Sequence, residues 1–300
     1  MPLTTYEEVR PWARAIKEQV LARRMPKWQA ARGFGSFKND PTLTPIEIGM
    51  IVSWVDGGLP FSISSPRVGS AVPSAPGASA STSGRASASS STPVASAFRR
   101  KIGIPSVRIP AGKSEAVAWV QAPWVSGWSF EPGDPLITSA TFTLAGGTAA
   151  GSWVAGDPPV TLPSNSAIRV SSSLRVRLER RAPADYEQPY KARASVLRLV
   201  TQEEAPARRA WIERVRCGSP WTGRPAELLA VRPSIGSDGS ARVWLERAGA
   251  PKNILGWFRD FDPRFSRTYW LARPVDLPID ARLQADTACE LELTLVRAVR

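Results

Sequence analysis

The sequence predicts a mainly β protein: two consecutive antiparallel β-sandwiches, preceded by a small α-helical unit and a flexible linker. Three observations predict it. Apolar residues recur at helical spacing only before about residue 60, small residues fill the stretch 64–97, and apolar and polar residues alternate beyond it. We expect the helical unit at residues 1–60, the linker at 61–100, the first sandwich at 101–205 and the second at 206–300.

The first predicted helix lies within residues 4–24. Thr4 or Thr5 stands three residues before Glu7 or Glu8, which is the spacing of a capping box. Apolar residues follow at helical spacing, and Pro11 marks a place where the helix can restart.

The second predicted helix begins after Thr44. Thr44 is the expected cap, Pro45 takes the first helical position and Glu47 completes a capping box. Gly57 is the expected end of this helix.

The linker and the strands differ in composition. Residues 64–97 are almost all Ser, Ala, Gly and Pro, so they can bury too little apolar surface to offset the entropy of ordering. Runs with a period of two follow, separated by Gly, Pro and Asp turns, and each run predicts a strand. The runs are residues 116–122, 136–144, 167–181, 194–200, 241–248 and 290–299.

The composition limits the chemistry. The chain has 12 Trp, 2 Cys and no His. Imidazole is a frequent metal ligand and the usual proton shuttle near neutral pH, so most metal and acid–base chemistry is excluded. A serine triad would lack its base. The formal charge of +13 suits nucleic acid, anionic lipid or an acidic protein surface, and it equally suits a basic solvated surface.

The two cysteines, Cys217 and Cys289, are too few for a disulfide framework and form no CxxC motif. They can form one bridge in an oxidising compartment or remain two buried thiols. The strand-like alternation around Cys289 favours buried thiols.

Residues 1–58 resemble the bacterial c-type cytochrome module that is fused to copper monooxygenase-like domains. The resemblance rests on the phrases MPLTTYEEVRPWARAIKEQVLARRMPKWQ and TPIEIGMIVSWVDGG. In that family a CxxCH motif lies upstream of the first phrase, and a His follows the Arg-Met-Pro-x-Trp phrase. This chain has Gln29 at the position of that His. The resemblance therefore implies a cytochrome c-like remnant that lacks its haem attachment.

The remainder is similar, more loosely, to type II copper ascorbate-dependent monooxygenases of the peptidylglycine-hydroxylating kind, which have two β-sandwiches with one copper on each. The resemblance places Thr138 and Ser139 at a His-His pair, and Ser234 and Gly236 at a His-x-His pair. A third ligand of the first copper is expected within residues 178–180. Ser, Thr and Gly do not replace imidazole donors, so we expect no metal, no cofactor and no catalytic residue.

An aromatic and Arg-rich segment, GWFRDFDPRFSRTYW, is the candidate interface. Trp, Tyr and Arg are enriched where proteins bind one another, although packing in the core is the alternative for these aromatic residues. The candidate interface residues are Trp257, Phe258, Arg259, Phe261, Arg264, Phe265, Tyr269 and Trp270.

The favoured hypothesis is a non-catalytic structural protein, an accessory subunit on the periplasmic face of a respiratory or photosynthetic membrane complex. Its expected partners are protein subunits of that redox complex, with anionic lipid head groups as a further candidate. The alternatives are a copper-dependent monooxygenase-like enzyme with an unrecognised site and, least favoured, a basic nucleic-acid-binding protein. No apolar run reaches the ~20 residues of a membrane span, and no signal peptide follows Met1. The sequence thus predicts a soluble, leaderless chain, and the periplasmic location is implied by the resemblance.

Overall fold

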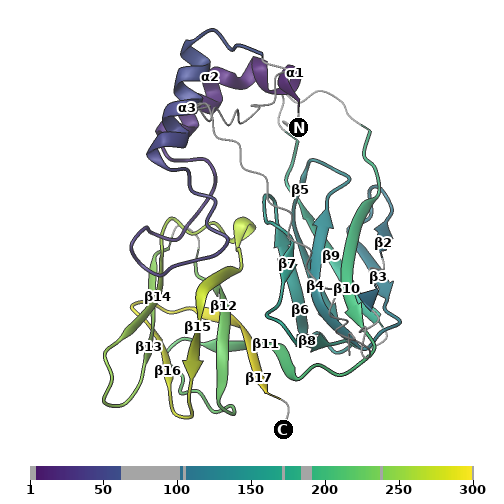
Figure 1. Ribbon diagram of the computed structural model, residues 1–300, viewed down its shortest axis with the longest axis vertical. Coiled ribbons are helices and arrows are strands. Elements are labelled where there is room, and N and C mark those ends of the chain that lie inside the picture. The colour runs from purple at the N-terminus through teal and green to yellow at the C-terminus, as the bar shows by residue number, and fades with distance from the viewer. Residues whose placement is uncertain are drawn as a thin grey trace, which may run out of the picture.

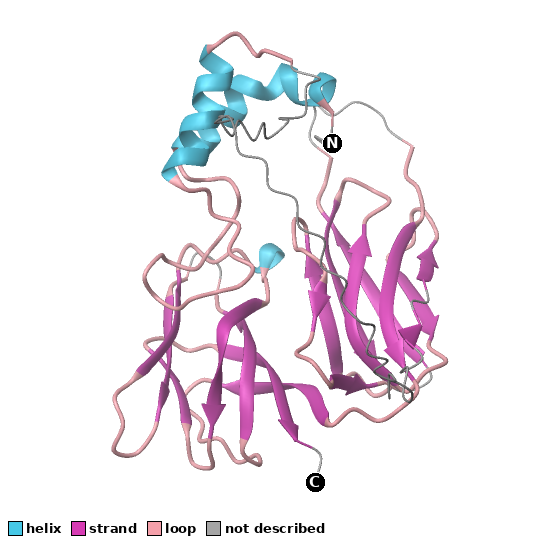
Figure 2. Ribbon diagram, in the orientation of Figure 1, coloured by secondary structure: helices cyan, strands magenta, loops and turns pink. Residues whose placement is uncertain are grey.

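The protein is mainly β, with a small group of helices at one end and strands in layers below it (Figures 1 and 2). The computed structural model describes residues 5–61, 102–103, 106–170, 173–183, 191–236 and 239–298. The predicted linker, residues 61–100, lies outside the described residues apart from Phe61.

The first predicted helix is confirmed, in three parts. These are α1 (Tyr6–Val9), a 3₁₀ turn η1 (Arg10–Trp12) and α2 (Ala13–Leu21). Thr5 and Glu8 form the capping box: the Glu8 N–H donates to Thr5 Oγ1 at 3.3 Å, and the Thr5 N–H donates to Glu8 Oε2 at 3.2 Å. The 3₁₀ turn contains Pro11, which has no N–H to donate to an α-helical bond.

The second predicted helix, α3 (Pro45–Asp56), is also confirmed at both ends. The Thr44 N–H donates to Glu47 Oε2 at 2.7 Å, and Thr44 Oγ1 accepts from the Glu47 N–H at 3.3 Å. Gly57 is the C-cap, where its N–H donates to the Ser53 carbonyl at 2.8 Å.

Two layers of strands enclose the first hydrophobic core, whose largest members include Trp128, Phe130, Phe142 and Trp153. One layer has the order β3 (Glu115–Trp119), β9 (Ser173–Arg180), β5 (Ile137–Leu144), β6 (Ala149–Val154). The other has the order β1 (Ile102–Gly103), β10 (Ser195–Gln202), β4 (Trp124–Glu131), β8 (Ser166–Arg169), with β2 (Ser106–Ile109) on β10 and β7 (Val160–Thr161) on β4. The run 167–181, predicted as one strand, contributes β8 and β9 to opposite layers.

The second core lies between two further layers and includes Phe258, Phe261 and Tyr269. One layer has the order β11 (Arg208–Arg216), β17 (Glu290–Ala298), β12 (Ala226–Ser234), β15 (Tyr269–Leu277). The other has the order β14 (Asn253–Phe258), β13 (Ala241–Glu246), β16 (Arg282–Ala285), and η2 (Pro263–Phe265) is a short turn before β15.

The strands around the first core, β1 to β10, form the first block, and those around the second core, β11 to β17, form the second block. A parallel pair of strands joins the two blocks. β8 pairs with β11 in parallel, with Ser166 opposite Arg208, so that one sheet of ten strands continues from the first block into the second. The first core also includes Ala210, Ile212, Leu229 and Val296 from strands of the second block. The sequence predicts antiparallel pairing alone, and the parallel pair differs from that prediction. The sheet continues past residue 205, so the division of the chain into two domains at that residue stays a prediction.

Cys217 and Cys289 form a disulfide bond. Antiparallel pairing of β11 and β17 places Arg216 opposite Glu290. Cys217 follows Arg216 and Cys289 precedes Glu290, so the two cysteines lie opposite each other just beyond the paired strands. The Cys217 N–H also donates to the Cys289 carbonyl at 2.9 Å. The interpretation as two buried thiols was therefore wrong, because the alternation that suggested it is the same for a bridged and a free cysteine.

Candidate functional site

Residues 26–39, here called the N-terminal strap, run along the edge strands of both layers of the second block. β14 and β15 are the edge strands of its two layers. The Ala31 N–H donates to the Trp257 carbonyl and the Arg259 N–H to the Gln29 carbonyl, at 2.7 and 2.8 Å. Further along, the Lys38 N–H donates to the Trp270 carbonyl at 2.7 Å. The strap thus satisfies backbone groups that an open edge would expose.

Glycine allows the strap to approach β14 closely. Gly35 has φ +82°, and a Cβ there would lie 2.4 Å from the Leu255 carbonyl oxygen. A side chain at this position would push the strap away from the sheet edge.

Aromatic rings fill the space between the strap and the sheets. Trp28 and Phe37 of the strap have ring centroids 4.7 and 5.3 Å from the Tyr269 ring, and the Phe258 ring lies 4.7 Å from Tyr269. Burial raises the pKa of the Tyr269 hydroxyl above its ordinary value. This hydroxyl donates a hydrogen bond to Gln29 Oε1 at 3.4 Å.

The candidate interface is therefore partly internal. Phe258, Phe261 and Tyr269 are buried in the second core, so as surface residues they were wrongly assigned. The strap covers part of the segment in which these residues lie.

The other candidate interface residues keep some exposure. The Trp257 and Phe34 rings pack edge to face with centroids 4.8 Å apart, and the Arg259 guanidinium lies 4.9 Å from the Trp257 ring centroid. The Lys27 ammonium lies 3.9 Å from the Phe265 ring centroid. Arg264 forms an ion pair with Asp262, which holds the pKa of that carboxyl below its ordinary value. Trp270 is half-buried, 6.3 Å from Trp128.

Gln29, at the position of the expected His, has a structural role. Its Nε2 donates to the Asp262 carbonyl at 3.3 Å, and its Oε1 accepts from the Tyr269 hydroxyl. Both cysteines of the chain are joined to each other in the second block, so neither thiol is available to attach a haem. These residues do not fit haem c.

The residues at the positions that the resemblance assigns to copper ligands do not suit copper. Thr138 and Ser139 lie on β5, where the Thr138 hydroxyl donates to the Glu179 carbonyl at 3.3 Å and the Ser139 hydroxyl to Glu179 Oε2 at 3.2 Å. Ser234 and Gly236 are exposed near the end of β12. Among the described residues no three His, Cys, Asp or Glu side chains gather as a metal site. The Thr138 and Ser139 hydroxyls are hydrogen-bonded to a neighbouring strand, and a hydroxyl is a poorer copper ligand than the imidazole that it would replace.

A buried ion pair connects the two blocks. Asp157, in the loop between β6 and β7, lies with its Oδ1 3.1 Å from Arg267 Nε, just before β15. Asp157 Oδ2 accepts from the Val154 N–H at 2.9 Å, while Arg267 Nη2 donates to the Ala155 carbonyl at 2.9 Å. Burial raises the pKa of Asp157, and the positive charge of Arg267 only partly opposes that rise.

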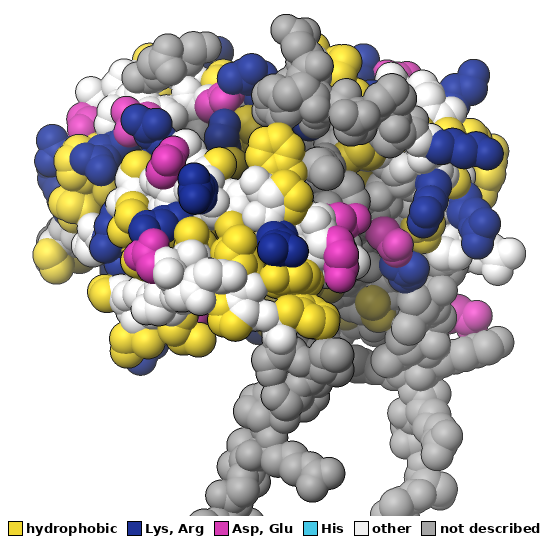
Figure 3. All heavy atoms as spheres, turned by 90° about the horizontal axis from the view of Figure 1, so that it is seen from above, with side chains coloured by type: hydrophobic (Ala, Val, Ile, Leu, Met, Phe, Trp, Pro, Cys, Tyr) yellow, Lys and Arg dark blue, Asp and Glu magenta, His cyan; other side chains and the backbone are white. Residues whose placement is uncertain are grey.

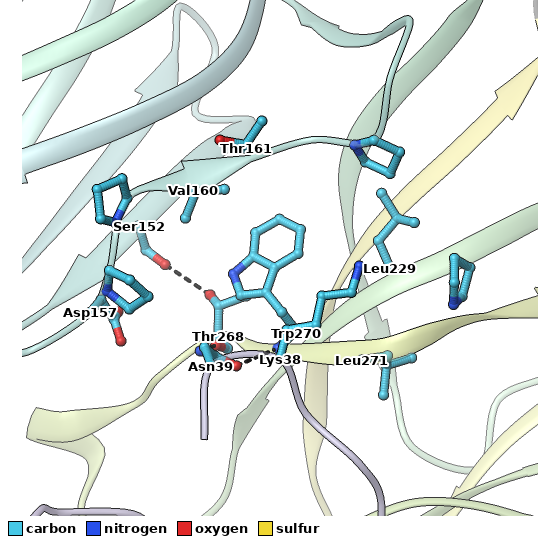
Figure 4. A pocket seen from close by; sticks show the side chains of 14 residues that line it. Lys38, Asn39, Ser152, Asp157, Val160, Thr161, Leu229, Thr268, Trp270 and Leu271 are labelled. Carbon is cyan, nitrogen blue, oxygen red and sulfur yellow. Dashed lines mark hydrogen bonds between the residues drawn. The ribbon is translucent and has the colours of Figure 1, made fainter. Parts of the chain in front are cut away.

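A hollow of about 190 Å³ lies beside this pair, between the strap and both blocks (Figure 4). The Ser152 and Thr268 hydroxyls share a hydrogen bond at 3.0 Å across it. Asn39 Nδ2 donates to the Thr268 carbonyl at 2.8 Å, and Asn39 Oδ1 accepts from the Trp270 N–H at 3.0 Å. These polar groups satisfy one another, so the arrangement holds three parts of the chain together.

Sequence reasoning missed the residues that form this junction. Asp157 stands in a Gly-Asp-Pro-Pro turn that resembles any loop, and Arg267 is one of 39 basic residues. Asn39 lies between the two predicted helices and precedes a proline by two positions, which predicts only a turn.

Helix α3 offers an apolar surface that the described residues do not cover. None of its residues is buried, and Ile46 and Met50 are 76% and 66% exposed. None of the helices in the described part of the chain has the length and apolar character needed to cross a membrane.

Comparisons with known proteins leave the family open. No family model matches the chain, and no curated protein matches it. Among solved structures it is similar to the major capsid protein P2 of bacteriophage PM2, at 7% sequence identity and a TM-score of 0.33, over 66% of this chain and 98% of that one. A likeness this low carries no functional argument. The strands and their layers define a mainly β, sandwich-type protein.

Proposed function

We propose that this protein is a non-catalytic structural subunit that docks on the periplasmic face of a membrane electron-transfer complex, respiratory or photosynthetic. The observation that carries the proposal is the role of Gln29. At the position where the resembled cytochrome module has its His, the Gln29 side chain bonds Tyr269 and Asp262 and fastens the strap to the second block.

Two further features support a docking role in the periplasm. The Cys217–Cys289 disulfide suits an oxidising compartment. Helix α3 leaves apolar side chains exposed, and exposed apolar surface is typical of interaction sites.

A copper-dependent monooxygenase-like enzyme is the alternative. It would need several nitrogen or sulfur donors converging on one point. Thr138 and Ser139 offer hydroxyl oxygens that already donate to Glu179, so the geometry favours the structural role.

Affinity purification from gently solubilised native membranes tests the docking role. We expect a tagged chain to retain a defined set of redox subunits in fixed stoichiometry, with none of them in a mock purification from untagged cells. Elution of the chain alone, from membranes whose electron-transfer complexes remain assembled, would overturn the proposal.

A further inference from the structure

A second hollow, of about 350 Å³, lies where the helical unit meets the strap and the end of β14. Its lining is mostly apolar and includes Met25 just before the strap, Phe34 of the strap, Ile48 of α3 and Trp257 of β14. Ligand pockets in proteins commonly combine an apolar lining with a few polar groups, and this volume lies at the lower end of their range.

The polar groups of this hollow are almost all cationic. Arg23, Arg32 and Arg259 line it, and no carboxylate is among the described residues that do. The Arg32 guanidinium donates to the Leu43 carbonyl at 2.7 Å, and the Arg259 guanidinium lies over the Trp257 ring. Within the described ranges, none of these three side chains forms an ion pair.

Elsewhere on the surface, some arginines have acidic partners. Arg177 pairs with Glu115 at 2.9 Å, and Arg198 pairs with Glu131 at 2.8 Å. A guanidinium group matches phosphate and carboxylate oxygens in geometry as well as charge. Among the described residues this positive charge has no acidic partner at the hollow, so it is complementary to an anionic head group.

The surroundings suit the apolar part of such a ligand. Ile48 brings α3 to the wall of the hollow, and no residue of α3 is buried. Viewed from the helical end, hydrophobic side chains and Lys or Arg side chains lie interspersed on one face of the molecule (Figure 3).

We propose that this hollow binds an anionic amphiphile, with a phosphate head group held by Arg23, Arg32 and Arg259 and an apolar chain against Met25, Ile48 and Trp257. The membrane is the source of such a ligand. The site does not depend on the protein being a subunit of a redox complex, so the two proposals fail separately.

Titration of the purified chain with short-chain lipids tests the site, using tryptophan fluorescence because Trp28 and Trp257 line the hollow. The probes are dihexanoylphosphatidic acid, dihexanoylphosphatidylcholine and inorganic phosphate. We expect the phosphatidic acid to bind at least tenfold more tightly than either of the others. The Trp257→Phe variant should lose most of the fluorescence change.

The charge requirement is tested by the double variant Arg32→Gln/Arg259→Gln, whose side chains are exposed and leave the core intact. It should bind the phosphatidic acid at least tenfold more weakly. The matched control is Arg175→Gln, an exposed position on β9 in the first block. Equal binding by the double variant, an equal loss in the control, or equally tight binding of inorganic phosphate would each overturn the inference.

Discussion

Asp157 and Arg267, which come from different blocks, lie buried with Oδ1 and Nε 3.1 Å apart. Asp157 Oδ1 is within ion-pair distance but has no hydrogen bond, so its contact with Arg267 is one of charge rather than of directed bonding. The pair joins the loop after β6 to the start of β15 beside the hollow of Figure 4.

Removal of the cation should destabilise the protein strongly. In Arg267→Met the Asp157 carboxylate stays buried without its positive partner, and we expect a loss of about 3–5 kcal/mol at neutral pH. The second change Asp157→Asn removes the stranded charge, so the double variant should recover much of that loss. Urea unfolding of the three proteins measures both effects, and a single variant as stable as the wild type would contradict the role of the pair.

The same carboxyl should make stability depend on pH. Because burial raises the pKa of Asp157 in the fold above its ordinary value of 3.8, its contribution is fully present below that value and is lost as pH rises through the folded pKa. The stability of the wild type relative to Asp157→Asn should therefore fall from acid towards neutral pH. Unfolding free energies measured across this range check the sign, and a rise would mean that Arg267 outweighs burial.

Reduction of the disulfide should weaken the fold. The bond closes a loop of 72 residues, and bonds of this kind contribute about 2–4 kcal/mol, largely through the unfolded chain. We expect the thermal midpoint of unfolding to fall when a reductant is added. The Cys217→Ser/Cys289→Ser variant should have the same midpoint as the reduced protein, and the reductant should not change it. A reductant-sensitive double variant would show that some other effect is being measured.

Substitutions on α3 should affect docking without affecting the fold. Ile46→Glu and Met50→Glu change side chains that are mostly exposed, so stability should stay within about 0.5 kcal/mol of the wild type. We expect both variants to lose the subunits that co-purify with the wild type. Ile279→Glu, at another exposed apolar position, serves as the control and should retain them. Retention by all three variants would place the docking surface elsewhere.

The local elements could be predicted from the sequence because their signals are local. Thr44 and Glu47 stand at the spacing of a capping box, and the structure uses them as one. The alternation in 290–299 likewise predicts β17, since a strand places alternate side chains on opposite faces.

The long-range contacts could not be predicted in this way. Pairing of the strap with β14 and β15 uses backbone groups, which every residue carries, so Ala31 and Lys38 give no signal. The parallel contact of β8 with β11 is similarly independent of side-chain type. The assignment of Phe258, Phe261 and Tyr269 to an exposed interface was wrong, because aromatic residues are as common in cores as in interfaces and these three are buried.

The most direct test is to purify the protein with its partners from native membranes, separate this chain from the redox subunits under non-denaturing conditions, and measure copper and haem per chain in the separated protein. The proposed loss of the haem and copper sites predicts far less than one equivalent of either in the separated chain. Copper or haem at close to one equivalent per chain would contradict it, because Gln29, Thr138, Ser139, Ser234 and Gly236 would then not mark lost sites.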